Sequence, residues 1–314
     1  MKAHLILLGL CAMAVAVAHG EPKDCPLVGG CDTSVFAVGV TVSGNYAYVA
    51  AEDSGLRVIS ISDPAHPALV GTCIDSIGSI SHVAVAGGYA YVTNYMDAVM
   101  WVISVSDPAH PHEVGYYASP GLVSGVALAG NYAYVSASHY GLRIVSIADP
   151  LHPTETGYCS DSTDRTDDVC MAGDYAYLAD SSGLRVISIA DPAHPVEVAR
   201  HAISSTARNV VVAGNRAYVG TYDGLVIISV ADPLHPTEVG SYDTPDEPEA
   251  LALVGDNVYV ADAGSGVGIL SAGDPANITE AGYCDTPAYC YDVTVAGSYV
   301  YVADGSSGLQ VFQY

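Results

Sequence analysis

The sequence predicts an all-β fold: a seven-bladed β-propeller of four-stranded antiparallel blades, with the ring closed by an N-terminal strand that joins the last blade. Three observations predict it. A tyrosine-rich strand phrase occurs seven times along the chain. Four short strand-forming segments, separated by turn residues, fit inside each period, and no helical period is present. The chain ends after the third strand of its last repeat, and a matching fourth strand lies near the N-terminus.

The repeated phrase is a run of tyrosine, alanine and valine that follows a tight turn. Its spacing is 41 to 43 residues, and a fixed period of this length indicates a radially repeated sheet with one supersecondary unit per repeat. The seven copies are Asn45–Val49, Gly88–Val92, Asn131–Val135, Asp174–Leu178, Asn215–Val219, Asp256–Val260 and Ser298–Val302.

Residues 1–20 read as a secretory signal peptide. Lys2 gives a positive start, the run from Leu5 to Ala18 is apolar but too short to span a bilayer, and small residues precede a cleavage point near Gly20. A lipoprotein signal is the alternative, although Leu10 stands where a small residue should precede Cys11. We therefore expect an extracellular or periplasmic location, no membrane span in the mature chain, and one domain over residues 21–314.

The first full repeat shows how one blade is built. The segments 38–42, 46–51, 56–61 and 68–73 are rich in residues that suit a pleated, buried surface. Glycine-containing turns separate the first three, and the Asp-Pro-Ala-His-Pro segment ends the third because proline cannot donate to a ladder. The tyrosines recur in every repeat, which favours packing between blades over an aromatic binding surface.

The two ends of the chain complement each other. Residues 308–313 form a third strand with no fourth after it, whereas residues 26–31 match the fourth strands of other repeats. Pairing these segments would complete the seventh blade and leave no open edge.

The charge of the chain limits its partners. Loss of residues 1–20 leaves 34 acidic against 8 basic residues, a net charge of −26. Such a surface disfavours nucleic acid, which requires a basic footprint. Proteins, carbohydrates and cations remain open as partners, and a monomeric domain is expected. The simpler interpretation of the charge is solubility.

Seven cysteines remain in the mature chain, so at least one has no partner within a monomer. Cys284 and Cys290 flank a short loop and form the expected disulfide. Cys25 and Cys31 bracket one extended strand, which would hold them about 20 Å apart, too far for a bridge. Asn277 begins an N-glycosylation sequon, Asn-Ile-Thr.

The repeats resemble the LVIVD-repeat family over residues 26–314. The nearest local matches to its third-strand phrase are Gly224–Pro233, Gly55–Pro64 and Gly183–Pro192. The family's usual aspartate after the apolar triplet is replaced by serine, as at Ser60 and Ser229. The resemblance implies a secreted or cell-surface propeller and supplies no catalytic residues.

Function in a propeller is expected where the blades differ, on loops presented by the rigid ring. The first residues of the innermost strands should meet at one mouth of the central channel. This predicts a ligand-binding set: His82, Asp167, Asp168, Arg208, Asn209, Glu249, Tyr291 and Asp292. Carboxylates, an arginine and an amide could hold a cation or a polar ligand there, or carry out acid–base chemistry. Alternatively, they are only solvated channel walls.

Two functions follow from this set. The first is an extracellular binding or interaction module, with no cofactor. The second is a propeller enzyme, a metal-assisted hydrolase or an oxidoreductase, with its site at the mouth. The acidic loop 160–168 leaves Ca²⁺ possible, but it lacks the glycine and final glutamate of a helix-loop-helix calcium site. A third possibility is a purely structural surface protein.

Overall fold

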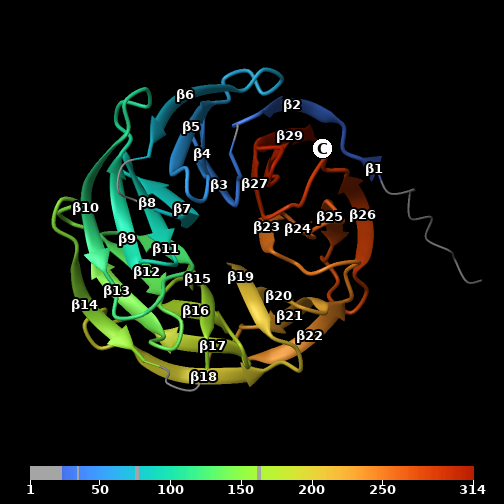
Figure 1. Ribbon diagram of the computed structural model, residues 1–314. Helices are drawn as coiled ribbons and strands as arrows, with labels where there is room; N and C mark the ends of the chain where they lie inside the picture. The colour runs from blue at the N-terminus through green and yellow to red at the C-terminus, as the bar shows by residue number, and fades with distance from the viewer. Residues whose placement is uncertain (1–22, 34, 75–77, 161–163) are drawn as a thin grey trace, which may run out of the picture.

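The computed structural model describes residues 23–33, 35–74, 78–160 and 164–314. These residues form a ring of seven sheets (Figure 1). Residues at one end of the innermost strands line a cavity, which is the mouth of the central channel. Each sheet is a blade built on four antiparallel strands, and within a blade consecutive strands are neighbours except where an N-terminal strand joins. All regular elements of the described residues are strands. The predicted seven-bladed propeller is therefore confirmed.

Each blade runs from an innermost strand at the channel to an outermost strand at the rim. In the first blade these strands are β3 (Gly39–Ser43), β4 (Tyr46–Ala50), β5 (Leu56–Ser60) and β6 (Ala68–Cys73), and in the second blade they are β7 (Ile80–Ala86), β8 (Tyr89–Asn94), β9 (Val99–Ser104) and β10 (His112–Ala118). The third blade contains β11 (Val126–Ala129), β12 (Tyr132–Ser136), β13 (Leu142–Ser146) and β14 (Thr154–Cys159). The fourth blade contains β15 (Thr166–Ala172), β16 (Tyr175–Asp180), β17 (Gly183–Ser188) and β18 (Val196–Ala202).

The remaining three blades follow the same plan, except that the last one takes its outermost strand from the N-terminus. The fifth blade contains β19 (Ala207–Ala213), β20 (Arg216–Thr221), β21 (Gly224–Ser229) and β22 (Thr237–Tyr242). The sixth blade contains β23 (Ala250–Val254), β24 (Asn257–Ala261), β25 (Val267–Ser271) and β26 (Thr279–Cys284). The seventh blade contains β27 (Asp292–Ala296), β28 (Tyr299–Ala303), β29 (Leu309–Gln313) and β2 (Leu27–Cys31).

The hydrophobic core lies between blades. The second and third strands of each blade are buried on both faces, because neighbouring blades cover them. One cluster joins Val49 of the first blade to Tyr301 and Val311 of the seventh. The tyrosines alternate along the second strand: Tyr48 is buried, whereas Tyr46 is only half-buried. The structure thus places the recurrent tyrosines at the contacts between blades.

The ring closes as the sequence predicts. β2 pairs antiparallel with β29, with Leu27 opposite Phe312 and Cys31 opposite Leu309. In Figure 1 the blue N-terminal strand lies along the outer edge of the red C-terminal blade. The backbone N of Gln313 also donates to the carbonyl of Pro26 at 3.1 Å. The seventh blade therefore contains strands from both ends of the chain.

A short strand before β2 was not predicted. β1 (Lys23–Asp24) pairs in parallel with β26, so that the sixth blade has five strands. The chain then crosses from the sixth blade to the seventh around Cys25 and Pro26, because Cys25 N still bonds Tyr283 O at 2.7 Å. The N-terminal segment consequently fastens two blades rather than one.

A glycine in the outermost strand allows the turn of the next blade to pack closely against it. A Cβ built on Gly71 would lie less than 3 Å from the carbonyl oxygen of Pro108, in the turn of the following blade. Gly29 meets Pro64 in the same way, across the junction where the ring closes. The closing junction therefore has the same geometry as an internal one.

The Asp-Pro-x-His-Pro turns lie at the outer part of the blades. In the first turn, Nδ1 of His66 lies 2.9 Å from Asp63 Oδ2, and Asp63 Oδ1 accepts from Ala65 N. His110, His152, His194 and His235 repeat this pairing with their own aspartates at 2.8 to 2.9 Å. Each of these histidines thus stabilises its own turn.

Candidate functional site at the channel mouth

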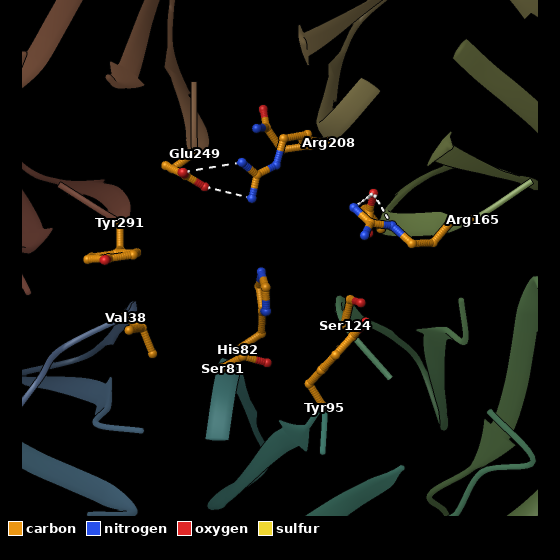
Figure 2. A pocket seen from close by; sticks show the side chains of 11 residues that line it. Val38, Ser81, His82, Tyr95, Ser124, Arg165, Arg208, Glu249 and Tyr291 are labelled. Carbon is orange, nitrogen blue, oxygen red and sulfur yellow. Dashed lines mark hydrogen bonds and ion pairs between the residues drawn. The ribbon is translucent and has the colours of Figure 1, made fainter. Parts of the chain in front are cut away.

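The innermost strands begin at one mouth of the channel, where a cavity of about 360 Å³ opens. Figure 2 shows side chains from several blades converging on it. The cavity is lined by Val38, Ser81, His82, Tyr95, Ser124, Arg165, Asp167, Arg208, Asn209, Glu249 and Tyr291. Six of the eight residues singled out from the sequence are among them. Asp168 and Asp292 are not.

Arg208 and Glu249 face each other across the junction of the fifth and sixth blades. Nη2 of Arg208 lies 2.9 Å from Oε2 of Glu249, and Nη1 donates to Oε1 at 3.2 Å. The two dashed lines in Figure 2 mark this double contact. Tyr289 also donates to Glu249 Oε1 at 2.8 Å, and the Arg208 guanidinium lies 5.4 Å from the Tyr222 ring centroid. Oε2 of Glu247 lies 3.7 Å from Nη1, so Arg208 is held and its charge is balanced.

Arg165 forms the second charge pair of the cavity. Its Nη2 and Nε donate to Asp167 Oδ2 at 2.8 and 3.1 Å. Burial raises the pKa of Asp167, although the hydrogen bond from Arg165 opposes the rise. The same hydrogen bond raises the pKa of Arg165. Both arginines of the cavity therefore carry their own carboxylate, and the lining has little unbalanced charge.

His82 projects into the middle of the mouth, with its ring directed toward the side of the cavity that carries Glu249 and Arg208 (Figure 2). The residue is exposed to solvent at the mouth. The protein atoms around the ring displace part of its hydration, and together with the nearby charge of Arg208 they lower the pKa of His82 below its ordinary value. The imidazole is therefore neutral near pH 7, with a nitrogen able to accept a hydrogen bond.

Asn209 lies deeper in the wall of the cavity. Its Nδ2 donates to the carbonyl of Pro248 at 2.9 Å, in the segment that leads into the sixth blade. Its Oδ1 is buried against Gly220 and has no hydrogen-bond partner. The Asn209 side chain thus joins the fifth and sixth blades, and only a small part of it is accessible to solvent.

Asp168 and Asp292 turn into the walls between blades. Asp168 accepts from Val210 N of the next blade at 3.0 Å and from Val169 N at 2.8 Å. Burial, partly offset by these two hydrogen bonds, raises the pKa of Asp168 to about 6. Burial likewise raises the pKa of Asp292 to about 7. Both carboxylates join adjacent blades, which explains why they do not line the cavity.

Five lining residues lie outside the predicted set. Val38, Ser81 and Ser124 occupy positions equivalent to that of Asp167, and two others lie elsewhere. Tyr95 lies in the turn between β8 and β9, and Arg165 immediately precedes β15. Arg165 had a signal in the sequence, because it is the one basic residue of the acidic loop 160–168. Tyr95 had none, since the corresponding turns differ in length and composition from blade to blade.

The described part of the loop 160–168 directs its carboxylates to different partners. Asp164 Oδ2 accepts from Arg200 Nη1 at 2.6 Å, and Asp167 accepts from Arg165. Residues 161–163 lie outside the described residues. Within the described ranges, no group of three or more histidine, cysteine or acidic side chains is arranged to hold a metal ion.

Cys284 and Cys290, the expected disulfide, are fully buried in one core cluster and are free thiols in this structure. Cys25 belongs to the same cluster, whereas Cys31 packs in another. Asn277 is exposed, and it occupies the histidine position of the turn in the sixth blade. The disulfide and the glycosylation both stay predictions.

The predicted signal peptide, residues 1–20, lies outside the described residues. Among those that the structure describes, no helix is long and apolar enough to cross a membrane.

Comparison with solved structures identifies similar propellers. The WD40 repeats of RRP9 match with a TM-score of 0.75 at 11% identity, covering 94% of this chain and 99% of that one. A putative 6-phosphogluconolactonase from Bacteroides uniformis matches with 0.70 at 13%, covering 79% and 85%. BamB from Moraxella catarrhalis matches with 0.61 at 15%, covering 92% and 83%. At these identities the likeness concerns the fold alone. No curated protein matches the sequence significantly.

The repeats themselves identify the family. The profile described as "LVIVD repeat" matches seven times: at residues 36–75, 77–119, 120–161, 165–202, 205–244, 249–286 and 288–312. The matches follow the seven blades, and the last one stops where the N-terminal strand completes the ring. The chain belongs to the LVIVD-repeat family.

Proposed function

We propose that the chain is a secreted or cell-surface binding module whose mouth cavity takes a neutral, polyhydroxylated ligand such as a sugar of a glycan. The observation that carries the proposal is the pairing of Arg208 with Glu249. With Arg165 also paired, it leaves a polar cavity in which an anionic ligand finds no unpaired cation among the described lining residues. A neutral ligand can bind both members of the pair through hydrogen bonds.

The shape and lining of the cavity support this ligand class. A volume of about 360 Å³ is within the usual range for small-molecule sites. Tyr95 and Tyr291 offer ring surface, and the hydroxyls, the carboxylates and neutral His82 offer donors and acceptors. The Tyr291 ring lies 4.5 Å from that of Tyr289 and is therefore held in a pair. Rigid aromatic rings beside fixed polar groups suit a flat, hydroxylated ligand.

Secretion is the second half of the proposal. It is supported by the leader-like residues 1–20 and by the strongly acidic composition. N-terminal sequencing of protein recovered from the culture medium or periplasm would test it. A mature N-terminus near Glu21 supports secretion, and an intact Met1 in protein confined to the cytoplasm contradicts it.

A carbohydrate microarray tests the binding half. Wild-type protein should retain neutral glycans, and the Arg208→Leu/Glu249→Leu variant should lose them. Glu238→Gln, at an exposed position of β22, is the control and should bind like the wild type. Equal binding by the double variant would exclude this cavity as the site.

Hydrolysis at the same mouth is the second candidate, and His82 is the observation that favours it. A neutral imidazole that projects into a polar cavity can accept a proton from a nucleophilic water. Turnover of p-nitrophenyl esters or glycosides that disappears in His82→Ala would favour an enzyme. Turnover that is absent from the wild type, or unchanged in the variant, favours the binding module.

A further inference from the structure

The parallel pairing of β1 with β26 brings two cysteines opposite each other. Lys23 is aligned with Gly282, and Asp24 with Tyr283. The next pair in this register is Cys25 with Cys284. The hydrogen bond from Cys25 N to Tyr283 O, at 2.7 Å, shows that the pairing continues to this point.

Neighbouring strands of a sheet lie about 4.8 Å apart, and aligned residues direct their side chains to the same face. A disulfide requires Cα atoms roughly 4.4 to 6.8 Å apart and Cβ atoms that face each other. Aligned cysteines in adjacent strands approach these conditions without rearrangement of the backbone. In this structure the thiols of Cys25 and Cys284 are hydrogen-bonded to each other and pack in one core cluster.

We infer that Cys25 and Cys284 form a disulfide in the mature protein, and that this bond ties the N-terminal segment to the sixth blade. Each thiol gives up one proton and one electron, and the S–S bond forms. The two electrons pass to a disulfide-bearing thiol oxidase or, more slowly, to molecular oxygen. Cys290 stays reduced.

The position of the bond gives it a role in the closed ring. Cys25 is the last residue that pairs with the sixth blade, and β2 joins the seventh blade two residues later. A crosslink there links residues 259 positions apart, and it prevents β2 from leaving the ring as a free terminal strand. Long closed loops gain most from a crosslink, because it restricts the unfolded chain.

Cys290 is the competitor for Cys284. It lies in the same cluster and is fully buried. It is nevertheless held by another sheet contact, since its backbone N donates to Ala263 O at 2.8 Å, in an isolated bridge. Burial also raises its thiol pKa well above the usual range, which suppresses the reactive thiolate. These facts favour Cys25 over Cys290 as the partner.

Peptide mapping without reduction distinguishes the two pairings. The full chain would be produced with its own leader in an oxidising compartment, alkylated, and digested with trypsin and chymotrypsin. Cleavage after Lys23, Leu27, Tyr283 and Tyr289 places the three cysteines on separate peptides. We expect peptide 24–27 to be linked to peptide 284–289, with Cys290 alkylated. A link between Cys284 and Cys290, or alkylation of both Cys25 and Cys284, would overturn the inference.

Thermal melting gives a second readout that does not depend on digestion. Dithiothreitol should lower the Tm of the wild type by about 5 to 10 °C. Cys25→Ser should melt at the lower temperature, with or without the reductant. Cys290→Ser should keep the full response to the reductant. A Cys25→Ser variant that still responds as strongly as the wild type would contradict the assignment.

Discussion

The carboxylate of Asp292 in the last blade accepts a hydrogen bond from the backbone N of Val40 in the first, at 2.7 Å. Asp168 makes the same contact with Val210, between the fourth and fifth blades, at 3.0 Å. The junction that closes the ring thus uses the same type of contact as the junction between the fourth and fifth blades. Residues at the start of the innermost strands line the cavity, join neighbouring blades, or, like Asn209, do both.

The half-buried carboxylate of Asp292 makes stability depend on pH. Its pKa in the folded protein is about 7, against an ordinary value of 3.8. Between these values the folded state holds a proton that the unfolded state has released, so the free energy of unfolding falls as the pH rises from 4 to 7. Above pH 7 this contribution no longer changes.

Replacement by asparagine should therefore change the pH profile of stability. We expect the difference in Tm between wild type and Asp292→Asn to move in favour of the variant as the pH rises from 4 to 7. Asp53→Asn, in an exposed turn, controls for the loss of one negative charge. Parallel pH profiles for wild type and Asp292→Asn would contradict the raised pKa.

The glycine contacts between blades give a test of ring closure. A Cβ at Gly29 or Gly71 would collide with the carbonyl of Pro64 or Pro108, so both alanine variants should be destabilised by about 1 to 3 kcal/mol. At Gly268 a Cβ meets nothing within 4 Å, so Gly268→Ala is the control. Chemical denaturation measures all three. A Gly29→Ala variant as stable as the control would mean that the closing junction is open in solution.

Arg57 lacks the carboxylate that its counterparts have. Arg185 pairs with Glu197 at 2.7 Å, and Arg143 lies 3.6 Å from Glu155. The corresponding position beside Arg57 is Leu69, which is exposed, and Nη1 of the buried Arg57 has no hydrogen-bond partner. The first blade therefore buries an arginine without the glutamate carboxylate that balances its charge in the third and fourth blades.

Leu69→Glu should supply the missing partner. We expect the free energy of unfolding to rise by about 1 kcal/mol, the ordinary value for a hydrogen-bonded charge at a partly exposed site. The same substitution in an Arg57→Leu background should give no gain, and a double-mutant cycle of denaturation curves measures the difference. An equal effect in both backgrounds would mean that the two side chains do not interact.

The fold could be predicted from the sequence because each blade repeats the same local signals. Gly44 and its equivalents take the positive φ that the tight turns require, and the apolar second strands occur only where both faces are covered. The pairing of residues 26–31 with the last blade could be predicted because a third strand there lacked a neighbour. β1 could not, since two residues carry no strand periodicity.

The candidate site could be predicted in position but not in detail. The alignment of innermost strands brought His82, Arg208 and Glu249 to one mouth, because the ring places equivalent residues at equivalent depth. It could not separate Glu249, which faces the cavity, from Asp292, which turns into the wall. That choice depends on a side-chain rotation and on backbone donors in the next blade.

The most direct test of the proposed function is calorimetric titration with a neutral sugar identified on the array and with its uronic acid counterpart, which carries a carboxylate. The wild type should bind the neutral sugar at least about tenfold more tightly, the equivalent of 1.4 kcal/mol. Glu249→Gln, which leaves Arg208 only the more distant and more exposed carboxylate of Glu247 at 3.7 Å, should reduce or abolish that preference. A wild type that prefers the acid, or a variant with unchanged selectivity, would contradict the account of the mouth as a charge-balanced site.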